Sequence, residues 1–352
     1  MFLPSTHHRL ARSLAVAAVG LACAVVAGCG GSSAGGNPAA DSPSQGPPPD
    51  DNDPLAQRIS AATATAASAT NPCVAIRPFY WELGDRTARL AAGSVQADNA
   101  LPVFTEDSIM SLASASKWIY GAYVAQLRQG ALTDEDVKYL TFRSGYSNFS
   151  RCLPGQSVDG CVAYQNNGVH SILTDGKFSY GGGHMQKHAS LNGLSALFNA
   201  GLAAEIRSRL GDELGLSYSQ PQLAGGGVGT PAGYARFLRK VLDGSLRMGA
   251  LLGSHAVCTN PDTCPPGEAV NTPVPPTESW HYSIGHWVED DPVVGDGAYS
   301  SAGAFGFYPW IDVSKTWYGI VARIATDDNG MGFASTQCGR LIRKAWAVGV
   351  AQ

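Results

Sequence analysis

A serine and a lysine three positions apart, Ser114 and Lys117, are the residues of this sequence best placed for nucleophilic chemistry. They open a segment whose apolar spacing predicts a helix that runs to Gly130. Residues three apart share a helix face, so the lysine amine can reach the serine hydroxyl. A lysine shielded from water can lose its proton near neutral pH and act as the base that activates serine. The pair therefore predicts a serine nucleophile beside the N–H groups of a helix start.

Four further stretches follow this pair along the chain. They are Tyr139–Tyr146 (YLTFRSGY), Asp175–Gly182 (DGKFSYGG), Leu223–Ala232 (LAGGGVGTPA) and Ser301–Gly306 (SAGAFG), with Trp310-Ile311-Asp312 after the last. In this order, behind Ser114-x-x-Lys117, they resemble motifs of the serine β-lactamase, DD-peptidase and family VIII esterase superfamily over about residues 80–350. The resemblance implies an α+β, β-lactamase/transpeptidase-like fold and hydrolysis through an acyl-enzyme on serine.

Carried over residue by residue, the resemblance assigns four roles. Ser114 is the nucleophile, Lys117 is its base, and Tyr180 is the phenol that passes the proton to the leaving group. The backbone N–H groups of Ser114 and Ala304 form the oxyanion hole. The set is chemically coherent, because attack needs a base, a departing alkoxide or amine needs an acid, and the oxyanion needs donors.

A second tyrosine, Tyr146, is the alternative to Tyr180. The run Tyr146-Ser147-Asn148 is a literal Y-x-N sequence, which makes Tyr146 and Asn148 candidates for the cleft. The preceding Ser144-Gly145, however, is similar to the Ser-Gly of an earlier segment of the family. That placement favours Tyr180 as the phenol.

Two positions depart from the family pattern. One segment of the family has the pattern F-x-Y-x-N, and this sequence has Gly182 at the position of its asparagine. The family also has a Lys/His-Thr-Gly triplet, which is Ser301-Ala302-Gly303 in this sequence. In lactamases and peptidases the cation and hydroxyl of that triplet help to grip a substrate carboxylate. Their absence argues against β-lactam and D-Ala-terminated substrates. His184, close behind Tyr180, could line the cleft and replace the missing asparagine.

Neither a metal nor a cofactor is expected. His184 and His188 have the i, i+4 spacing of a metal-binding helix face, but the acid of H-E-x-x-H and an evident third ligand are missing. The glycine-rich run from Gly225 to Thr230 has neither GK[ST] nor G-x-G-x-x-G, so a nucleotide site is not predicted.

Composition excludes other classes of protein. The 352 residues are 44% hydrophobic and 15% charged, which is globular composition. The 24 Lys and Arg against 28 Asp and Glu give a formal net charge of −4. Without a basic excess to neutralise phosphates, nucleic acid is not an expected partner.

The N-terminal residues predict export. Arg9 and Arg12 precede an apolar run, Leu14–Val26, that ends in Val26-Ala27-Gly28-Cys29. This pattern is typical of a lipoprotein signal peptide over residues 1–28, with cleavage before Cys29 and acylation of its thiol. An ordinary secretory signal cut elsewhere is the alternative. On the first interpretation, lipid on Cys29 anchors the chain to the membrane on its cell-envelope side.

Residues 29–54 are mostly Gly, Ser, Pro and Asp, and they predict a disordered tether. The folded domain is then expected over residues 55–352. Six cysteines fall within it, and an even number in an exported chain suggests disulfides. The pairs Cys152–Cys161 and Cys258–Cys264 each enclose a short loop, which leaves Cys73 with Cys338.

Apolar periodicity and turn residues suggest the elements that position these residues. Helices are expected at Leu55–Ala67, from Thr133, at Leu191–Leu210, Pro231–Leu242 and Ser335–Val348, and strands at Val74–Leu83, Thr87–Val95, His281–Glu289, Gly303–Ile311 and Thr316–Ala325. Strands at both ends and helices between them predict one antiparallel sheet built from both termini and flanked by helices, with a mainly helical lobe inserted at roughly 115–275.

The function expected from these features is an exported serine hydrolase that acts through Ser114 on an ester or amide, either a small molecule or a component of the cell envelope. One alternative is a catalytically silent envelope-binding lipoprotein that keeps the cleft without turnover. A further alternative is a penicillin-binding protein or β-lactamase.

Overall fold

The computed structural model describes residues 53–97, 102–325 and 331–352. The expected signal peptide, Cys29 and the tether up to residue 52 lie outside the described residues. The helices are α1 (Pro54–Ala67), α2 (Ser116–Leu127), α3 (Asp134–Leu140), α4 (Val158–Val162), α5 (Gly183–Leu191), α6 (Asn199–Leu210), α7 (Pro231–Leu242), α8 (Met248–Leu251) and α9 (Met331–Val348).

The strands are mostly short. They are β1 (Phe79–Asp85), β2 (Arg89–Val95), β3 (Met110–Ser111), β4 (Phe178–Ser179), β5 (Ser217–Tyr218), β6 (Gly227–Gly229), β7 (Val257–Cys258), β8 (Ala269–Asn271), β9 (His281–Tyr282), β10 (Trp287–Glu289), β11 (Ala298–Ser300), β12 (Tyr308–Ile311) and β13 (Trp317–Ala322).

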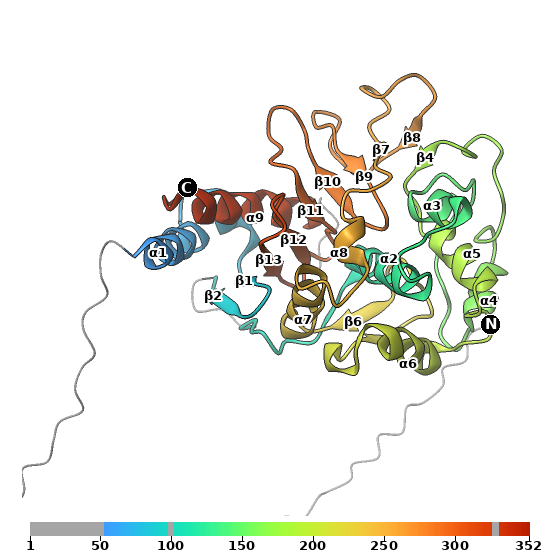
Figure 1. The fold of residues 1–352 in the computed structure, drawn as a ribbon, viewed down its shortest axis with the longest axis horizontal. Helices are drawn as coiled ribbons and strands as arrows, with labels where there is room; N and C mark the ends of the chain where they lie inside the picture. The colour runs from blue at the N-terminus through green and yellow to red at the C-terminus, as the bar shows by residue number, and fades with distance from the viewer. Residues whose placement is uncertain (1–52, 98–101, 326–330) are drawn as a thin grey trace, which may run out of the picture. The chain divides into compact units, whose positions relative to one another are not determined.

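One antiparallel sheet joins the two ends of the folded chain. Its eight strands run in the order β2-β1-β13-β12-β11-β10-β9-β7, so the N-terminal hairpin β1–β2 pairs with the C-terminal strand β13. Of the helices between β2 and β7, α7 packs on β1 and β13, and the others form a lobe beside the sheet (Figure 1). The expected α+β fold, with a sheet from both termini and an inserted helical lobe, is confirmed.

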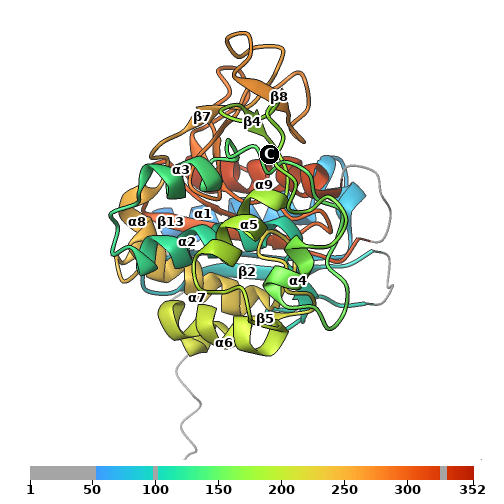
Figure 2. The same ribbon diagram turned by 90° about the vertical axis from the view of Figure 1, so that its right-hand side faces the viewer.

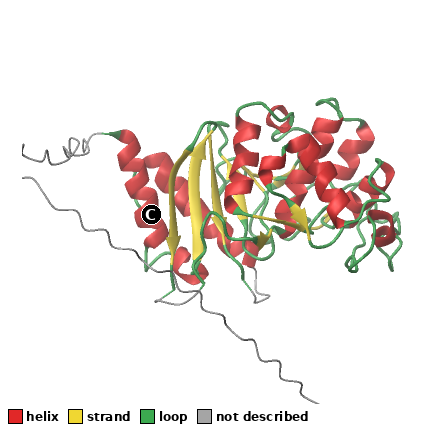
Figure 3. Cartoon of the chain, turned by 90° about the horizontal axis from the view of Figure 1, so that it is seen from below, coloured by secondary structure: helices red, strands yellow, loops and turns green. Residues whose placement is uncertain are grey.

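The sheet separates two apolar cores. In β1, Phe79, Trp81 and Leu83 pack on the side of α1 and α9, whereas Tyr80 belongs to the core on the side of the helical lobe. Alternate strand residues point to opposite faces, which explains how one strand serves both cores. Seen from below, the sheet stands between the helix layer that carries the C-terminus and the helical lobe (Figure 3).

At the centre of the lobe lies α2, whose residues from Ser116 to Ala125 are all buried. A helix covered on every side holds its side chains in fixed positions. A small sheet, β3-β6-β5, borders its start, and β4 pairs in parallel with β8 at the end of the lobe where β7 also lies (Figure 2). These elements surround the residues that the sequence predicts to be catalytic, Ser114, Lys117 and Tyr180.

Some expected elements differ in the structure. Of the helix predicted over Leu191–Leu210, only Asn199–Leu210 (α6) is helical; Leu191 ends α5, and the chain then turns at Gly193, whose φ of +85° is in the left-handed region that favours glycine. The strand predicted over His281–Glu289 is the hairpin β9–β10, which turns through Gly285 at φ +75°. The segment from Gly303 begins as a turn before β12, and α9 starts four residues before Ser335.

The described residues contain three disulfides, and they are the predicted ones. Cys73 is bonded to Cys338, 265 positions away, and this bond ties the N-terminal part of the folded chain to α9. Cys152–Cys161 and Cys258–Cys264 close short loops. Disulfides of this kind are typical of chains that fold in an oxidising compartment, and they support export. Within the described residues, no helix combines the length and the apolar character needed to cross a membrane.

Candidate active site

Ser114 lies in a tight turn that leads into α2. The turn is the 3₁₀ segment Ala113–Ala115, and the N–H of Leu112 just before it donates to the carbonyl of Gly227 in β6 at 2.9 Å. Ala113 has a φ of +43°, a left-handed conformation that is uncommon for a residue with a side chain. The surrounding packing holds this strained residue and thereby fixes the direction of the Ser114 side chain.

Lys117 is the partner that the spacing predicted. Its Nζ lies 2.8 Å from Ser114 Oγ and donates to the carbonyl oxygen of Ala224 at 2.7 Å. Burial lowers the pKa of Lys117 from about 10.5 to about 7. Among the described residues no carboxylate forms an ion pair with this amine. A neutral amine can therefore donate one N–H to Ala224 and accept the Ser114 proton on its lone pair.

Two glycines let the backbone approach the helix that carries Lys117. A Cβ on Gly121 in α2 would lie 2.5 Å from the carbonyl oxygen of Ile284, and one on Gly285 would lie 2.4 Å from the carbonyl oxygen of Lys117. Gly285 also has positive φ. The β9–β10 turn therefore packs directly on α2 and seals the side of the helix next to Lys117.

Tyr180, which follows β4, faces the same pair. Lys117 Nζ lies 4.9 Å from the centre of its ring, and the ring stacks on Trp287 at 5.4 Å. Burial raises the pKa of Tyr180 to about 12, although a hydrogen bond with Ser114 acts in the opposite direction. The phenol is therefore protonated at neutral pH and can relay a proton, while Lys117 is the group that can accept one.

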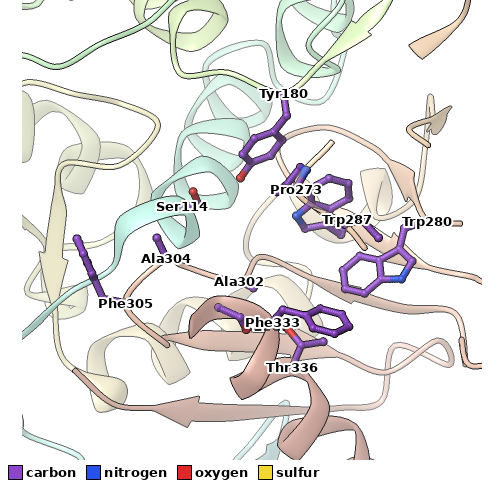
Figure 4. A pocket seen from close by; sticks show the side chains of 12 residues that line it. Ser114, Tyr180, Pro273, Trp280, Trp287, Ala302, Ala304, Phe305, Phe333 and Thr336 are labelled. Carbon is purple, nitrogen blue, oxygen red and sulfur yellow. Dashed lines mark hydrogen bonds between the residues drawn. The ribbon is translucent and has the colours of Figure 1, made fainter. Parts of the chain in front are cut away.

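The Ser301–Gly306 segment forms the opposite wall. Ser301 is buried and its hydroxyl donates to the carbonyl oxygen of Ser114 at 3.1 Å. Gly303 lies so close to Leu112 that a Cβ would be 2.3 Å from its carbonyl oxygen. The turn that follows presents Ala304 at the cavity. The N–H of Ser114 belongs to the first turn of a helix, where N–H groups lack intrahelical partners, and Ala304 lies beside Ser114 in the lining of the same cavity (Figure 4).

Ser114, Tyr180 and Ala304 meet at a cavity of about 360 Å³ (Figure 4). Its lining is Ser114, Tyr180, Pro273, Val274, Trp280, Trp287, Ala302, Ala304, Phe305, Gly332, Phe333 and Thr336. Hollows of about 610, 590 and 420 Å³ lie elsewhere. The first two bring no hydroxyl side chain together with a lysine or histidine, and in the third, beside Ser144, Lys138 is paired with Asp175. Among the hollows in the described residues, the Ser114 cavity is the one whose hydroxyl contacts an amine with a lowered pKa.

The other cleft candidates are placed away from this cavity. Tyr146 stacks on Tyr139 at 5.8 Å and lines a different hollow, so the structure favours Tyr180 as the phenol. Asn148 is exposed, and its main-chain carbonyl abuts Gly183. A Cβ on Gly182 would meet the Phe149 ring at 3.1 Å.

His184 does not line the cavity, which corrects the expectation that it faces the cleft. It is fully buried and stacks on Phe142, while its Nε2 donates to the carbonyl of Ser179 at 2.9 Å. Its Nδ1 lies 2.7 Å from the hydroxyl of Ser144. Burial lowers the pKa of His184 to about 4, so it is neutral and holds the segment before Tyr180 in place.

His188, the other member of the i, i+4 pair, is also buried and has other partners. Its Nε2 donates to Asp136 at 2.9 Å, and its Nδ1 lies 2.8 Å from the hydroxyl of Tyr120. Asp136 in turn closes the capping box with Thr133 that starts α3. Within the described part of the chain there is no group of three His, Cys, Asp or Glu residues arranged to hold a metal ion.

Sequence reasoning missed several residues of the site. The carbonyl of Ala224 holds Lys117, and Ala113 carries the strained backbone, yet neither side chain is reactive. Trp280 and Phe333 line the cavity from segments distant in sequence. The aromatic composition around His281 was a signal for the first, whereas Phe333 was hidden because the closing helix was expected to begin at Ser335.

No protein-family model matches the sequence, and no curated protein matches it. Solved structures do match. A β-lactamase from Mycobacterium bovis has a TM-score of 0.53 and 11% identity over 76% of this chain and 95% of its own. Simvastatin synthase from Aspergillus terreus has a TM-score of 0.54 and 13% identity over 84% and 99%. EstCE1, a hydrolase with promiscuous acyltransferase activity, has a TM-score of 0.58 and 12% identity over 82% and 98%.

At these identities the likeness concerns the fold. It extends over most of each compared chain. The described chain therefore has a β-lactamase-like fold.

Proposed function

We propose that the chain is an exported serine hydrolase that cleaves an ester or amide through an acyl-enzyme on Ser114. The observation that carries the proposal is the Lys117 amine, 2.8 Å from the Ser114 hydroxyl, with its pKa lowered by burial to about 7. A surface lysine stays protonated at neutral pH and cannot accept a proton. This one is neutral in about half of the molecules at that pH, and it touches the hydroxyl that it would activate.

The proposed reaction begins when Ser114 Oγ attacks the substrate carbonyl carbon and gives its proton to neutral Lys117. The oxyanion is held by the N–H groups of Ser114 and Ala304. As the intermediate collapses, the bond to the leaving group breaks, and its oxygen or nitrogen receives the Lys117 proton through the hydroxyl of Tyr180. Water then attacks the acyl-enzyme by the reverse route, which releases the carboxylic acid and restores Ser114.

An ester or amide without a carboxylate beside the reacting carbonyl fits the cavity better than a β-lactam does. Ser301, at the start of the triplet, already donates its hydroxyl to the main chain of Ser114, and Ala302 has no polar group to offer. Among similar folds, EstCE1 is a hydrolase with acyltransferase activity, so the fold is compatible with acyl transfer from esters.

The proposal places the enzyme outside the cytoplasm. The disulfides support export. The lipobox-like sequence before Cys29 supports a lipid anchor that holds the domain at the membrane through the tether of residues 29–54. Esters or amides of the cell envelope, or small molecules that reach it, are then within range.

The test is intact mass spectrometry of the purified domain after treatment with a broad serine-reactive phosphonate and, separately, with a penicillin. A stoichiometric phosphonate adduct is expected in the wild type and in Ser190→Ala, which removes a distant serine on α5. Ser114→Ala should give no adduct. Labelling that persists in Ser114→Ala would overturn the assignment.

The penicillin arm separates the alternatives. Phosphonate adduct without penicillin adduct supports an esterase or amidase, whereas a Ser114-dependent penicillin adduct would favour a penicillin-binding protein or β-lactamase. If neither reagent labels the folded domain, the chain is better described as a silent binding protein, and the hydrolase proposal fails.

A further inference from the structure

The cavity beside Ser114 has an open end and a closed end. Phe305, on the turn after Ala304, is 43% exposed, whereas Trp280 and Trp287 are each 3% exposed. Figure 4 places Phe305 and Trp280 at opposite ends of the lining, with Ser114 between them. A substrate bound at Ser114 therefore has one side toward solvent and one side enclosed.

Apolar side chains make up the enclosed end, called here the aromatic arm. The aromatic arm consists of the buried Val274, Trp280 and Trp287 and the half-buried Phe333, with the exposed Pro273 at its rim. Trp280 and Trp287 pack edge to face, with ring centres 5.7 Å apart, and Phe333 lies 6.5 Å from Trp280. Side chains fixed in this way offer rigid apolar surface to a ligand.

Charged groups hold the arm from behind and do not enter it. The Arg340 guanidinium lies 4.9 Å from the centre of the Trp280 ring and 6.0 Å from that of Phe333. It pairs with Glu278 at 2.7 Å and with Glu289 at 3.1 Å. Glu278 also accepts the Trp280 indole N–H at 2.8 Å. Arg340 is thus neutralised by two carboxylates, and it serves to orient the two aromatic walls.

Polar groups available to a ligand are concentrated near Ser114. No charged side chain lines the cavity in the part of the chain that the structure describes. Thr336, which lines the cavity from α9, donates its hydroxyl to the carbonyl of Gly332 at 3.1 Å. An anionic group that entered the arm would lose its hydration without gaining a partner, which is strongly unfavourable. An uncharged hydrocarbon would gain free energy with each methylene buried.

We infer that the aromatic arm binds the acyl chain, and that the substrates are esters of uncharged, medium-length aliphatic acids. This inference rests on the proposed function. The acyl group stays on Ser114 while the alcohol departs, so the enclosed end suits the acyl chain and the open end at Phe305 suits the leaving alcohol. The reaction converts the ester and water into the fatty acid and the alcohol.

The first experiment measures kcat/KM for p-nitrophenyl esters from acetate to octanoate. We expect a rise of about fourfold for each methylene from acetate to hexanoate, the value for transfer of one CH₂ from water to an apolar site. The p-nitrophenyl monoester of suberic acid, which ends in a carboxylate, should be about 100-fold slower than the octanoate ester. Equal rates for all chain lengths, or a faster suberate ester, would overturn the inference.

A pair of matched variants locates the effect. Phe333→Ala removes one wall of the arm and should lower the octanoate-to-acetate ratio of kcat/KM about tenfold. Phe198→Ala removes an exposed ring before α6, outside the cavity, and should leave the ratio unchanged. A ratio that falls equally in both variants would contradict the assignment of the arm.

Binding is tested without turnover in Ser114→Ala by tryptophan fluorescence. Octan-2-one should bind at least about tenfold more tightly than octanoate, and failure of octan-2-one to bind would overturn the inference. Acetate turnover without dependence on chain length would overturn the acyl-chain assignment and leave the proposed function standing. If the wild type gives neither turnover nor a phosphonate adduct, the proposed function fails, and octan-2-one binding alone decides whether the arm is an apolar site.

Discussion

Replacing Lys117 with methionine removes an ionisable group that the fold keeps away from water. Burial lowers the pKa of Lys117 from about 10.5 to about 7, so between these values the unfolded chain binds more protons than the folded protein. Stability therefore rises with pH across this window. Each pH unit between the two pKa values adds about 1.4 kcal/mol. This one group therefore makes the wild type about 3 kcal/mol more stable at pH 9 than at pH 6.

The measurement is urea unfolding at pH 6 and pH 9 with the disulfides intact. Lys117→Met should lack this increment of about 3 kcal/mol, because its side chain does not titrate. Lys344→Met, which replaces an exposed lysine of α9, should follow the wild type within about 0.5 kcal/mol. If the wild type and Lys117→Met changed in parallel between the two pH values, Lys117 would not have a depressed pKa, and its role as base would be refuted.

Three further predictions follow from the same geometry. Because the neutral form of Lys117 is the active one and burial lowers its pKa to about 7, kcat/KM for an ester should fall about tenfold per pH unit below that value and level off above it; a flat profile from pH 5 to 9 would contradict this. Tyr180→Phe should lower kcat about 100-fold with little change in unfolding free energy, measured by steady-state kinetics and urea unfolding, because only the relay hydroxyl is lost. Cys73→Ser should reduce the unfolding free energy by about 2–5 kcal/mol in the same assay, since its bond to Cys338 spans 265 positions; an unchanged midpoint would show that this closure contributes little.

Much of the site could be read from the sequence because the reactive residues are close together or stand in recognisable local settings. Ser114 and Lys117 are three apart, so helical geometry alone predicts their contact, and the structure has it at 2.8 Å. Cys73 was predicted to pair with Cys338 because the other four cysteines close two short loops and leave these two. Local spacing and elimination were sufficient in both cases.

Other parts depend on tertiary contacts that leave no local pattern. Ala224 offers a main-chain carbonyl to Lys117, and any residue type has such a group. Ala113 adopts positive φ because the neighbouring packing demands it, against its own preference. Phe333 and Trp280 meet only after α9 packs against the sheet, so the aromatic arm was not visible in the order of residues. The helix predicted from Leu191 begins only at Asn199, because Gly193 turns the chain in a left-handed conformation that apolar periodicity does not register.

The claim that Ser114 carries an acyl intermediate is tested most directly by rapid-quench peptide mapping with p-nitrophenyl hexanoate. The account predicts that, in the first turnover, the peptide containing Ser114 gains the mass of one hexanoyl group, and that Tyr180→Phe slows both its appearance and its loss. Hydrolysis of the ester without an acylated peptide, or acylation of a different residue, would contradict the account.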